Sequence, residues 1–86
     1  MQSQTEITWN GIRITGTVEI TRGDYFEPDW TEVEIDSMEL ESDEDLSTFL
    51  AEHDMPAEWK NLPKACEEWI EKKFLDQILD ELAKEA

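Results

Sequence analysis

The chain has 86 residues, 38% of them hydrophobic and 35% charged, and its 23 acidic and 7 basic residues give a formal net charge of −16. The length predicts one domain, residues 1–86, with little material for a deep active site. The charge disfavours binding to nucleic acid or anionic membranes and favours basic partners. The apolar fraction, which includes four tryptophans, is enough for one core and argues against a wholly disordered chain.

The cysteine content and the first residues of the chain indicate in which cellular compartment the protein acts. Cys66 is the only cysteine, so the chain forms no disulfide within itself, and a reducing compartment is favoured. Residues 1–11 do not combine a positively charged start with an apolar run, as a secretory signal would. No apolar stretch approaches the roughly 18 residues of a membrane span. These features predict a cytoplasmic protein that does not enter a membrane.

The first third of the chain has the pattern of a β-hairpin. Apolar and polar residues alternate on both sides of Asn10-Gly11, which is the favoured two-residue type I′ turn. That turn places the apolar residues of both strands on one face, with these cross-strand pairs: Trp9 with Ile12, and Ile7 with Ile14. Gly16 falls on the same face, which indicates either a bulge or close packing of a helix.

A third strand is predicted over residues 31–40, which completes a β-meander over residues 5–40. Val33 and Ile35 occupy one phase of the alternation, and Met38 and Leu40 occupy the other. This slip predicts a β-bulge near Asp36-Ser37.

Two helices follow the strands. Ser42 is a helix-capping residue, and three acids after it complement the positive end of a helix macrodipole, which predicts a short helix over 42–54. A long helix is predicted over 63–85, where apolar residues recur every four positions: Cys66, Ile70, Phe74, Ile78 and Leu82. The predicted fold is therefore α+β, with a three-stranded antiparallel β-meander packed against a long C-terminal helix and a short helix before it.

Acidic residues dominate the middle of the chain. From Asp24 to Glu58 there are 14 acidic residues and no lysine or arginine. On the predicted third strand the acids alternate with apolar residues and so share the outward face, and beyond the bulge the row continues to the start of the short helix. The candidate partner-binding carboxylates are Glu32, Glu34, Asp36, Glu39, Glu41, Asp43, Glu44 and Asp45.

Two interpretations of this acidic row are open. A phosphate-mimicking surface would occupy the basic cleft of a nucleic-acid-binding protein, whereas a solvated face would only keep the protein soluble. Carboxylates two residues apart on a strand are about 6.6 Å apart, and DNA carries one charge per about 3.4 Å of each strand. Adjoining acids such as Glu19, Asp24 and Glu27 would raise the density of negative charge on this surface. The lack of interleaved bases, the ordered strand and the cost of self-repulsion weigh toward the mimic.

Three aromatic residues accompany the acids. Tyr25, Phe26 and Trp30 lie in the segment predicted to connect the second and third strands. Two roles are open for them: they fold over the sheet edge and close the core, or they stay exposed and anchor a protein partner. They are included among the candidate partner-binding residues.

Other chemistry has weaker support in the sequence. Four acids in one segment have the oxygen ligands of a Ca²⁺ site but not the spacing of an EF-hand: Asp24, Glu27, Asp29 and Glu32. One cysteine and one histidine, His53, do not make a structural zinc site. Cys66 falls on the apolar stripe of the long helix, where a buried and inert thiol is expected. No metal, cofactor or catalytic residue is predicted.

The segment from Val33 to Leu50 carries a strand-then-helix pattern, in which Val-Glu-Ile-Asp-Ser-Met-Glu-Leu is followed by Asp45-Leu46 and Phe49-Leu50. This pattern resembles short hypothetical proteins encoded by bacteriophages, a resemblance that names no activity. In size and acidity the chain is also similar to phage DNA-mimic inhibitors, which block restriction enzymes, CRISPR complexes, repair glycosylases or recombination nucleases. That similarity implies action in the bacterial host cytoplasm, and it carries over no functional residues.

The leading hypothesis is an acidic binding protein, not an enzyme. It would inhibit or modulate a nucleic-acid-binding protein of the anti-CRISPR, anti-restriction or nuclease-inhibitor type by presenting a DNA-mimicking carboxylate face. Its partner would be a protein with a basic nucleic-acid-binding surface, and the chain would be a monomer or homodimer that does not bind nucleic acid itself. The alternative is a small phage structural or assembly protein that acts through its long helix or an exposed third-strand edge.

Overall fold

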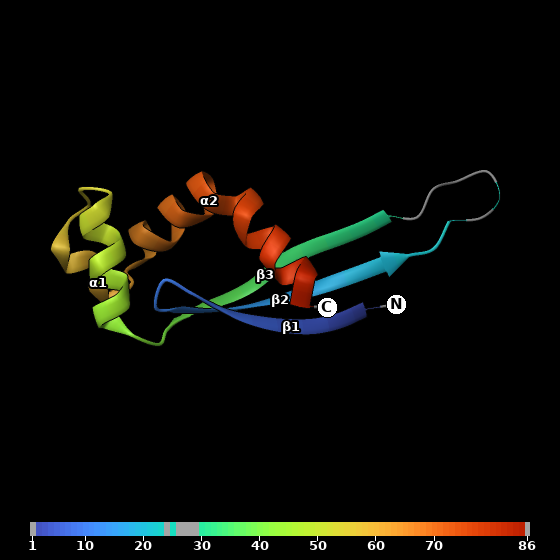
Figure 1. Cartoon of the computed structure of the whole chain (residues 1–86), viewed down its shortest axis with the longest axis horizontal. Helices are drawn as coiled ribbons and strands as arrows, with labels where there is room; N and C mark the ends of the chain where they lie inside the picture. The colour runs from blue at the N-terminus through green and yellow to red at the C-terminus, as the bar shows by residue number, and fades with distance from the viewer. Residues whose placement is uncertain (1, 24, 26–29, 86) are drawn as a thin grey trace.

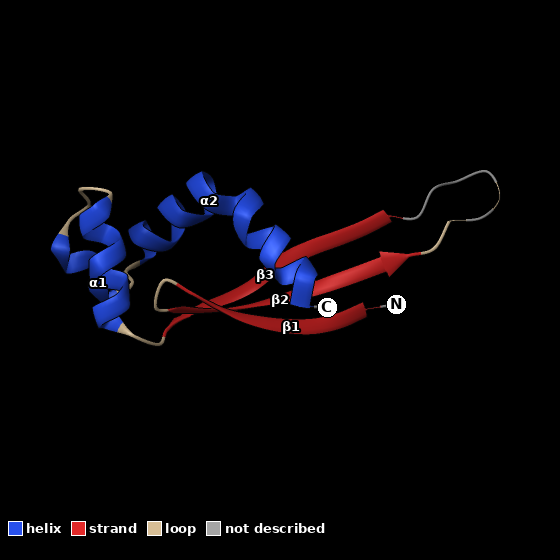
Figure 2. Ribbon diagram, viewed as in Figure 1, coloured by secondary structure: helices blue, strands red, loops and turns tan. Residues whose placement is uncertain are grey.

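The computed structural model describes residues 2–23, 25 and 30–85, which form three strands and then three helical segments (Figure 1). In chain order the elements are β1 (Gln2–Trp9), β2 (Ile12–Thr21), β3 (Trp30–Leu40), α1 (Asp43–Glu52), the 3-10 helix η1 (Ala57–Asn61) and α2 (Lys64–Glu85). The strands form one antiparallel sheet in the order β1-β2-β3, so β1 and β3 are its edges. The helices lie over one face and one end of the sheet (Figure 2). This arrangement confirms the predicted α+β fold.

The turn between β1 and β2 has the geometry that the sequence predicts. Asn10 and Gly11 have positive φ angles of 49° and 84°, as a type I′ turn requires at both central positions. The predicted cross-strand pairs both form: Trp9 with Ile12, and Ile7 with Ile14. The Asn10-Gly11 turn therefore determines which residues of β1 and β2 form the apolar face of the hairpin.

The predicted β-bulge is present on β3. Thr15 pairs with Ser37, but the next residue, Gly16, pairs with Ile35, so Asp36 is the extra residue. One extra residue on one strand shifts the side-chain alternation by one position. The acids on the two sides of the bulge therefore stay on the same face of the sheet.

Gly16 also lets α2 pack directly against the sheet. A Cβ atom at this position would lie 2.7 Å from the Glu34 carbonyl oxygen and 2.8 Å from Cδ1 of Leu82. Both interpretations of this glycine, the bulge and close helix packing, are therefore correct.

The hairpin turn fixes the start of α1. The Gly11 carbonyl oxygen accepts hydrogen bonds from the backbone N–H groups of Glu41 and Ser42, both at 2.9 Å. The Ser42 hydroxyl then accepts a hydrogen bond from the backbone N–H of Asp45 at 3.3 Å, which confirms its role as the helix cap. The turn, the end of β3 and the first turn of α1 form one hydrogen-bonded unit.

α2 bends at Phe74, a feature that the sequence pattern does not predict. Phe74 has φ −119° and ψ 15°, outside the helical region. The second half of the helix then descends over the sheet (Figure 1). The residues that α2 buries fall on both sides of the bend and follow the predicted stripe: Cys66, Ile70, Ile78 and Leu82.

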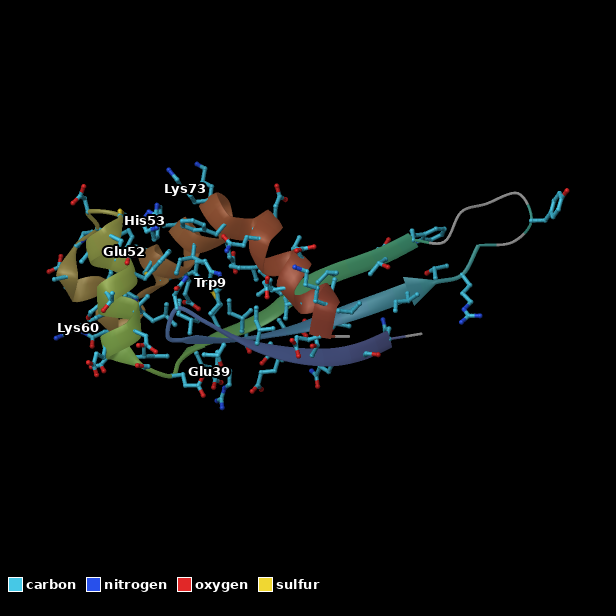
Figure 3. All side chains as sticks on the ribbon, in the orientation of Figure 1. Trp9, Glu39, Glu52, His53, Lys60 and Lys73 are labelled. Carbon is cyan, nitrogen blue, oxygen red and sulfur yellow. The ribbon has the colours of Figure 1, made fainter. Side chains whose placement is uncertain are left out.

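An aromatic cluster joins the sheet to both helices. The Trp9 ring lies 4.9 Å from Phe49 and 5.3 Å from Phe74, measured between ring centroids, and Figure 3 shows Trp9 between the sheet and the helices. His53, an exposed residue at the end of α1 as expected, lies 4.6 Å from Phe49. Edge-to-face and tilted contacts of this kind add to the apolar burial. Trp9 is thus the strand residue on which both helices converge.

The molecule is long for its size. Its extents are 52 × 19 × 18 Å and its radius of gyration is 15.0 Å, against about 12 Å for a compact domain of this length. The far ends of β2 and β3 extend beyond α2 (Figure 1), and Ile20 is accordingly 39% exposed. None of the described helices combines the length and the apolar composition that a membrane span requires.

The Cys66 thiol is fully buried on the inner side of α2. Burial raises its pKa to about 11, from an ordinary 9.0, with a smaller contribution from Glu67. The thiolate is the reactive form of cysteine. The expected buried and inert thiol is therefore present.

Cys66 should resist thiol reagents in the folded protein at pH 9.0, the ordinary pKa of the thiol, and react rapidly after denaturation. The unfolded chain loses this proton first, so the free energy of unfolding should fall as pH rises from 9.0 to about 11. Labelling rates and thermal melts measure these effects. Cys66→Ala, which lacks the thiol, should show a smaller loss over that pH interval; an equal loss would contradict the assignment.

Candidate functional site

The face of the sheet that points away from α2 collects carboxylates from all three strands. Along each strand the side chains alternate between the core and this outer face. The register of the strands and the hydrogen bonds of Thr8 and Thr17 assign the acids to it, and Figure 3 shows Glu39 on this side. We call this surface the acidic face; its carboxylates are Glu6, Glu19, Glu32, Glu34, Asp36, Glu39 and Glu41.

Near the hairpin turn, the acidic face is partly neutralised or hydrogen-bonded. Arg13 on β2 forms an ion pair and hydrogen bond with Glu39 directly across the sheet. This hydrogen bond and the negative charge of Glu39, followed by that of Glu6, raise the pKa of the Arg13 guanidinium. The hydroxyl of Thr8 donates to Glu41 at 2.8 Å. The carboxylates at this end are therefore oriented by neighbours on β1 and β2.

Asp36 occupies the bulge and is oriented in a similar way. Its carboxylate accepts a hydrogen bond from the Thr17 hydroxyl at 2.7 Å. The bulge re-aims this side chain without removing it from the row. Asp36 thus connects the two halves of the acidic face.

At the far end of the strands, the carboxylates face one another. Glu19 on β2 pairs directly with Glu32 on β3, and Glu34 lies two residues further along β3. These three side chains line a depression of about 410 Å³, together with Gln2, Thr17 and Val33. Like charges placed directly opposite each other destabilise a sheet. Among the described residues, none of the three has an ion-pair partner.

Asp43, Glu44 and Asp45 lie at the start of α1, beyond the end of β3, and are all exposed. Their position has a structural explanation, because negative side chains in the first turn stabilise a helix. Asp45 lies against the hairpin turn, where Gly11 approaches its Cβ. These acids extend the charge past the sheet but do not belong to its outer face.

The aromatic candidates divide between two environments. Trp30 begins β3, is 46% exposed and lies on the same phase as Glu32 and Glu34, so it stands at the far end of the acidic face. Tyr25 is 94% exposed. Neither belongs to the core, so the first of the two roles considered, closing the core, is wrong for Tyr25 and Trp30. Phe26 lies outside the described residues.

Sequence reasoning found the β3 row and named Glu19 as an adjoining acid, and it missed Arg13 and Glu6. The signal for both was present in the hairpin register, which places every second residue of β1 and β2 on the outer face. The expected contributions of Asp24 and Glu27 lie outside the described residues. So do three of the four acids considered for Ca²⁺, and the described residues contain no cluster suited to a metal ion.

The depressions on the described surface are shallow. One of about 560 Å³ lies along the end of β2 from Glu19 to Arg22. Another, of about 410 Å³, lies between the hairpin turn and α1. The chain matches no known family model, no curated protein and no solved structure. The function therefore has to be argued from the acidic face itself.

Proposed function

We propose that the acidic face binds the basic nucleic-acid-binding cleft of another protein. By occupying that cleft, the chain would compete with nucleic acid for it. This is the role of an inhibitor or modulator of the anti-CRISPR, anti-restriction or nuclease-inhibitor type. The observation that carries the proposal is the direct opposition of Glu19 and Glu32 beside Glu34. The far end of the face holds like charges together at a cost to stability, and a basic partner would relieve that cost.

Charge distribution over the molecule supports the same surface. The acidic face has seven carboxylates and a single base, Arg13. Five of the seven basic residues lie instead on the helical side, in η1 and α2: Lys60, Lys64, Lys72, Lys73 and Lys84. η1 and α2 also carry eight acids, but these are interleaved with the five lysines, whereas the acidic face has a single base. A basic cleft would therefore meet fewer like charges on the acidic face than on α2.

Trp30 adds an apolar contact at the end of this surface. It is half-exposed, and it shares a phase of β3 with Glu32 and Glu34. Tryptophan is among the residues that most often dominate binding energy at protein interfaces. A partner that is basic along the face and apolar at its far end would fit both features.

The proposed binding should depend on many weak contacts and on salt. Each exposed ion pair contributes about 0–1 kcal/mol, so affinity comes from the collective field and from fast association. Screening shortens the range of this field from about 30 Å at 0.01 M salt to about 3 Å at 1 M. Binding should therefore weaken steeply as salt is added.

The test is affinity capture from bacterial lysate, with bound proteins identified by mass spectrometry at low and high salt. The wild-type protein should retain one nucleic-acid-binding protein or complex that high salt or added duplex DNA releases. The triple variant Glu32→Gln, Glu34→Gln, Asp36→Asn should bind that protein roughly 10–100-fold more weakly, a loss of about 1.4–2.8 kcal/mol.

The matched control has the same charge change on the exposed side of α2: Glu68→Gln, Glu71→Gln, Asp76→Asn. This control should bind like the wild type, because it leaves the acidic face intact. Capture of no nucleic-acid-binding protein would overturn the proposal. Equal weakening by both triple variants would show that net charge, and not this face, governs binding.

A further inference from the structure

β1 is the second edge of the sheet, and half of its backbone groups face outward. In a hairpin with a two-residue turn, the residues that flank the turn exchange both backbone hydrogen bonds, and this alternates along the strand. Every second residue from Trp9 back to Ser3 therefore bonds to β2. The residues between them direct their N–H and C=O groups away from the sheet: Gln2, Gln4, Glu6 and Thr8. Within the described residues, no strand pairs with this edge.

The two edges of the sheet differ in charge and shape. β3 carries four acids and the bulge at Asp36, and both features discourage another strand from pairing with it. β1 has one acid, Glu6, and no base, proline or bulge among its eight residues. In a chain of net charge −16, β1 is therefore the edge that a second acidic chain can approach at the least electrostatic cost.

The side chains of β1 are complementary to those of the same strand in a second copy. In an antiparallel pair centred on Thr5, each Glu6 lies opposite a Gln4, whose amide can donate to the carboxylate. Thr5 lies opposite its own copy, and threonine pairs are among the favourable cross-strand contacts. No carboxylate faces another carboxylate in this register. The backbone groups also meet correctly in this register. Gln4 and Glu6, on either side of Thr5, both direct their N–H and C=O groups away from their own sheet, so each can hydrogen-bond the other's counterpart in the second copy.

We propose that two copies of the chain pair through β1 in this register and form one continuous six-stranded antiparallel sheet. Both acidic faces then lie on the same side, and the two β3 rows run along opposite edges, about 24 Å apart at roughly 4.8 Å per strand. The interface uses backbone groups and polar side chains, with Glu6 as the one charged residue that each β1 contributes. It stands apart from the proposed function, because it requires no other partner.

Sedimentation equilibrium of the purified full chain tests the pairing, at about 0.5 M salt so that the repulsion between acidic chains is screened. The expected mass rises with concentration toward twice 10.1 kDa. Gln4→Glu places a carboxylate opposite Glu6 of the second copy and should weaken dimerisation at least tenfold, whereas Gln4→Lys should strengthen it. Gln77→Glu on the exposed side of α2 makes the same charge change as Gln4→Glu away from β1 and should leave dimerisation unchanged.

A second variant tests the backbone contact itself. Gln4→Pro removes an N–H that points to solvent, a position at which an edge strand accepts proline, so circular dichroism should show a folded chain that remains monomeric. Folded wild-type protein that stays at 10.1 kDa at every concentration would overturn the proposal. A dimer that persists in both Gln4→Glu and Gln4→Pro would also overturn it, because its interface would lie elsewhere.

Discussion

Replacing Gly11 with alanine should lower the free energy of unfolding by about 3 kcal/mol or more. Gly11 has a φ of +84°, which L side chains rarely adopt. An added Cβ would also lie 2.2 Å from the Ser42 carbonyl oxygen and 2.8 Å from the Leu46 nitrogen. Both are backbone atoms that cannot move without disturbing the start of α1. Chemical denaturation should show the loss, and the melting temperature should fall by roughly 12 °C or more.

The neighbouring turn residue supplies the control. Asn10 has a φ of 49°, a conformation that glycine adopts without strain. Asn10→Gly should therefore change the free energy of unfolding by less than about 1 kcal/mol. If Gly11→Ala were as mild as Asn10→Gly, the turn would not be held against α1 as described.

Trp9→Ala should destabilise the protein by about 3–5 kcal/mol, the usual cost of removing a large buried aromatic side chain. Trp9 is 7% exposed, and its ring contacts Phe49 on α1 and Phe74 at the bend of α2. Its removal would leave a cavity where the two helices meet the sheet. Denaturation followed by circular dichroism measures the effect, since other tryptophans complicate fluorescence.

Trp30→Ala is the matched control for Trp9→Ala. Trp30 is 46% exposed and is not part of the core cluster, so its loss should cost less than about 1 kcal/mol. The same variant should weaken capture of a partner by the acidic face. Equal destabilisation by both tryptophan variants would contradict the assignment of Trp9 as the central core contact.

The elements of the fold follow from signals that are local in the sequence. Asn10-Gly11 specifies its turn type, and the turn then fixes which residues of β1 and β2 share a face. The change of phase between Ile35 and Met38 reveals the bulge because alternation has a strict period of two. Ser42 marks the start of α1 because its hydroxyl satisfies a free N–H group.

Contacts between distant segments could not be predicted in the same way. The Arg13–Glu39 ion pair depends on the register of β2 against β3, which is set by the bulge together with the length of the connection before Trp30. The bend at Phe74 depends on how α2 fits both the aromatic cluster and the sheet, and the apolar stripe continues unbroken through it. The sequence therefore predicts the acidic row of β3 but not which of its carboxylates already form an ion pair or a hydrogen bond within the protein.

The position of Tyr25 shows a further limit of sequence reasoning. An aromatic residue beside a sheet usually closes the core, but Tyr25 is 94% exposed. Tyr25 follows a strand whose end already extends beyond α2 (Figure 1), so none of the described helices is available there to cover it. How far a helix reaches along a sheet is a tertiary property that composition and periodicity do not encode.

The elongated shape of the chain affects how its size can be measured. A molecule 52 Å long and 18–19 Å across experiences more friction in solution than a sphere of the same mass. On gel filtration a monomer would elute early and give an apparent mass closer to that of a compact dimer. An elution volume alone would therefore report self-association even where none exists, whereas light scattering and sedimentation equilibrium report mass independently of shape.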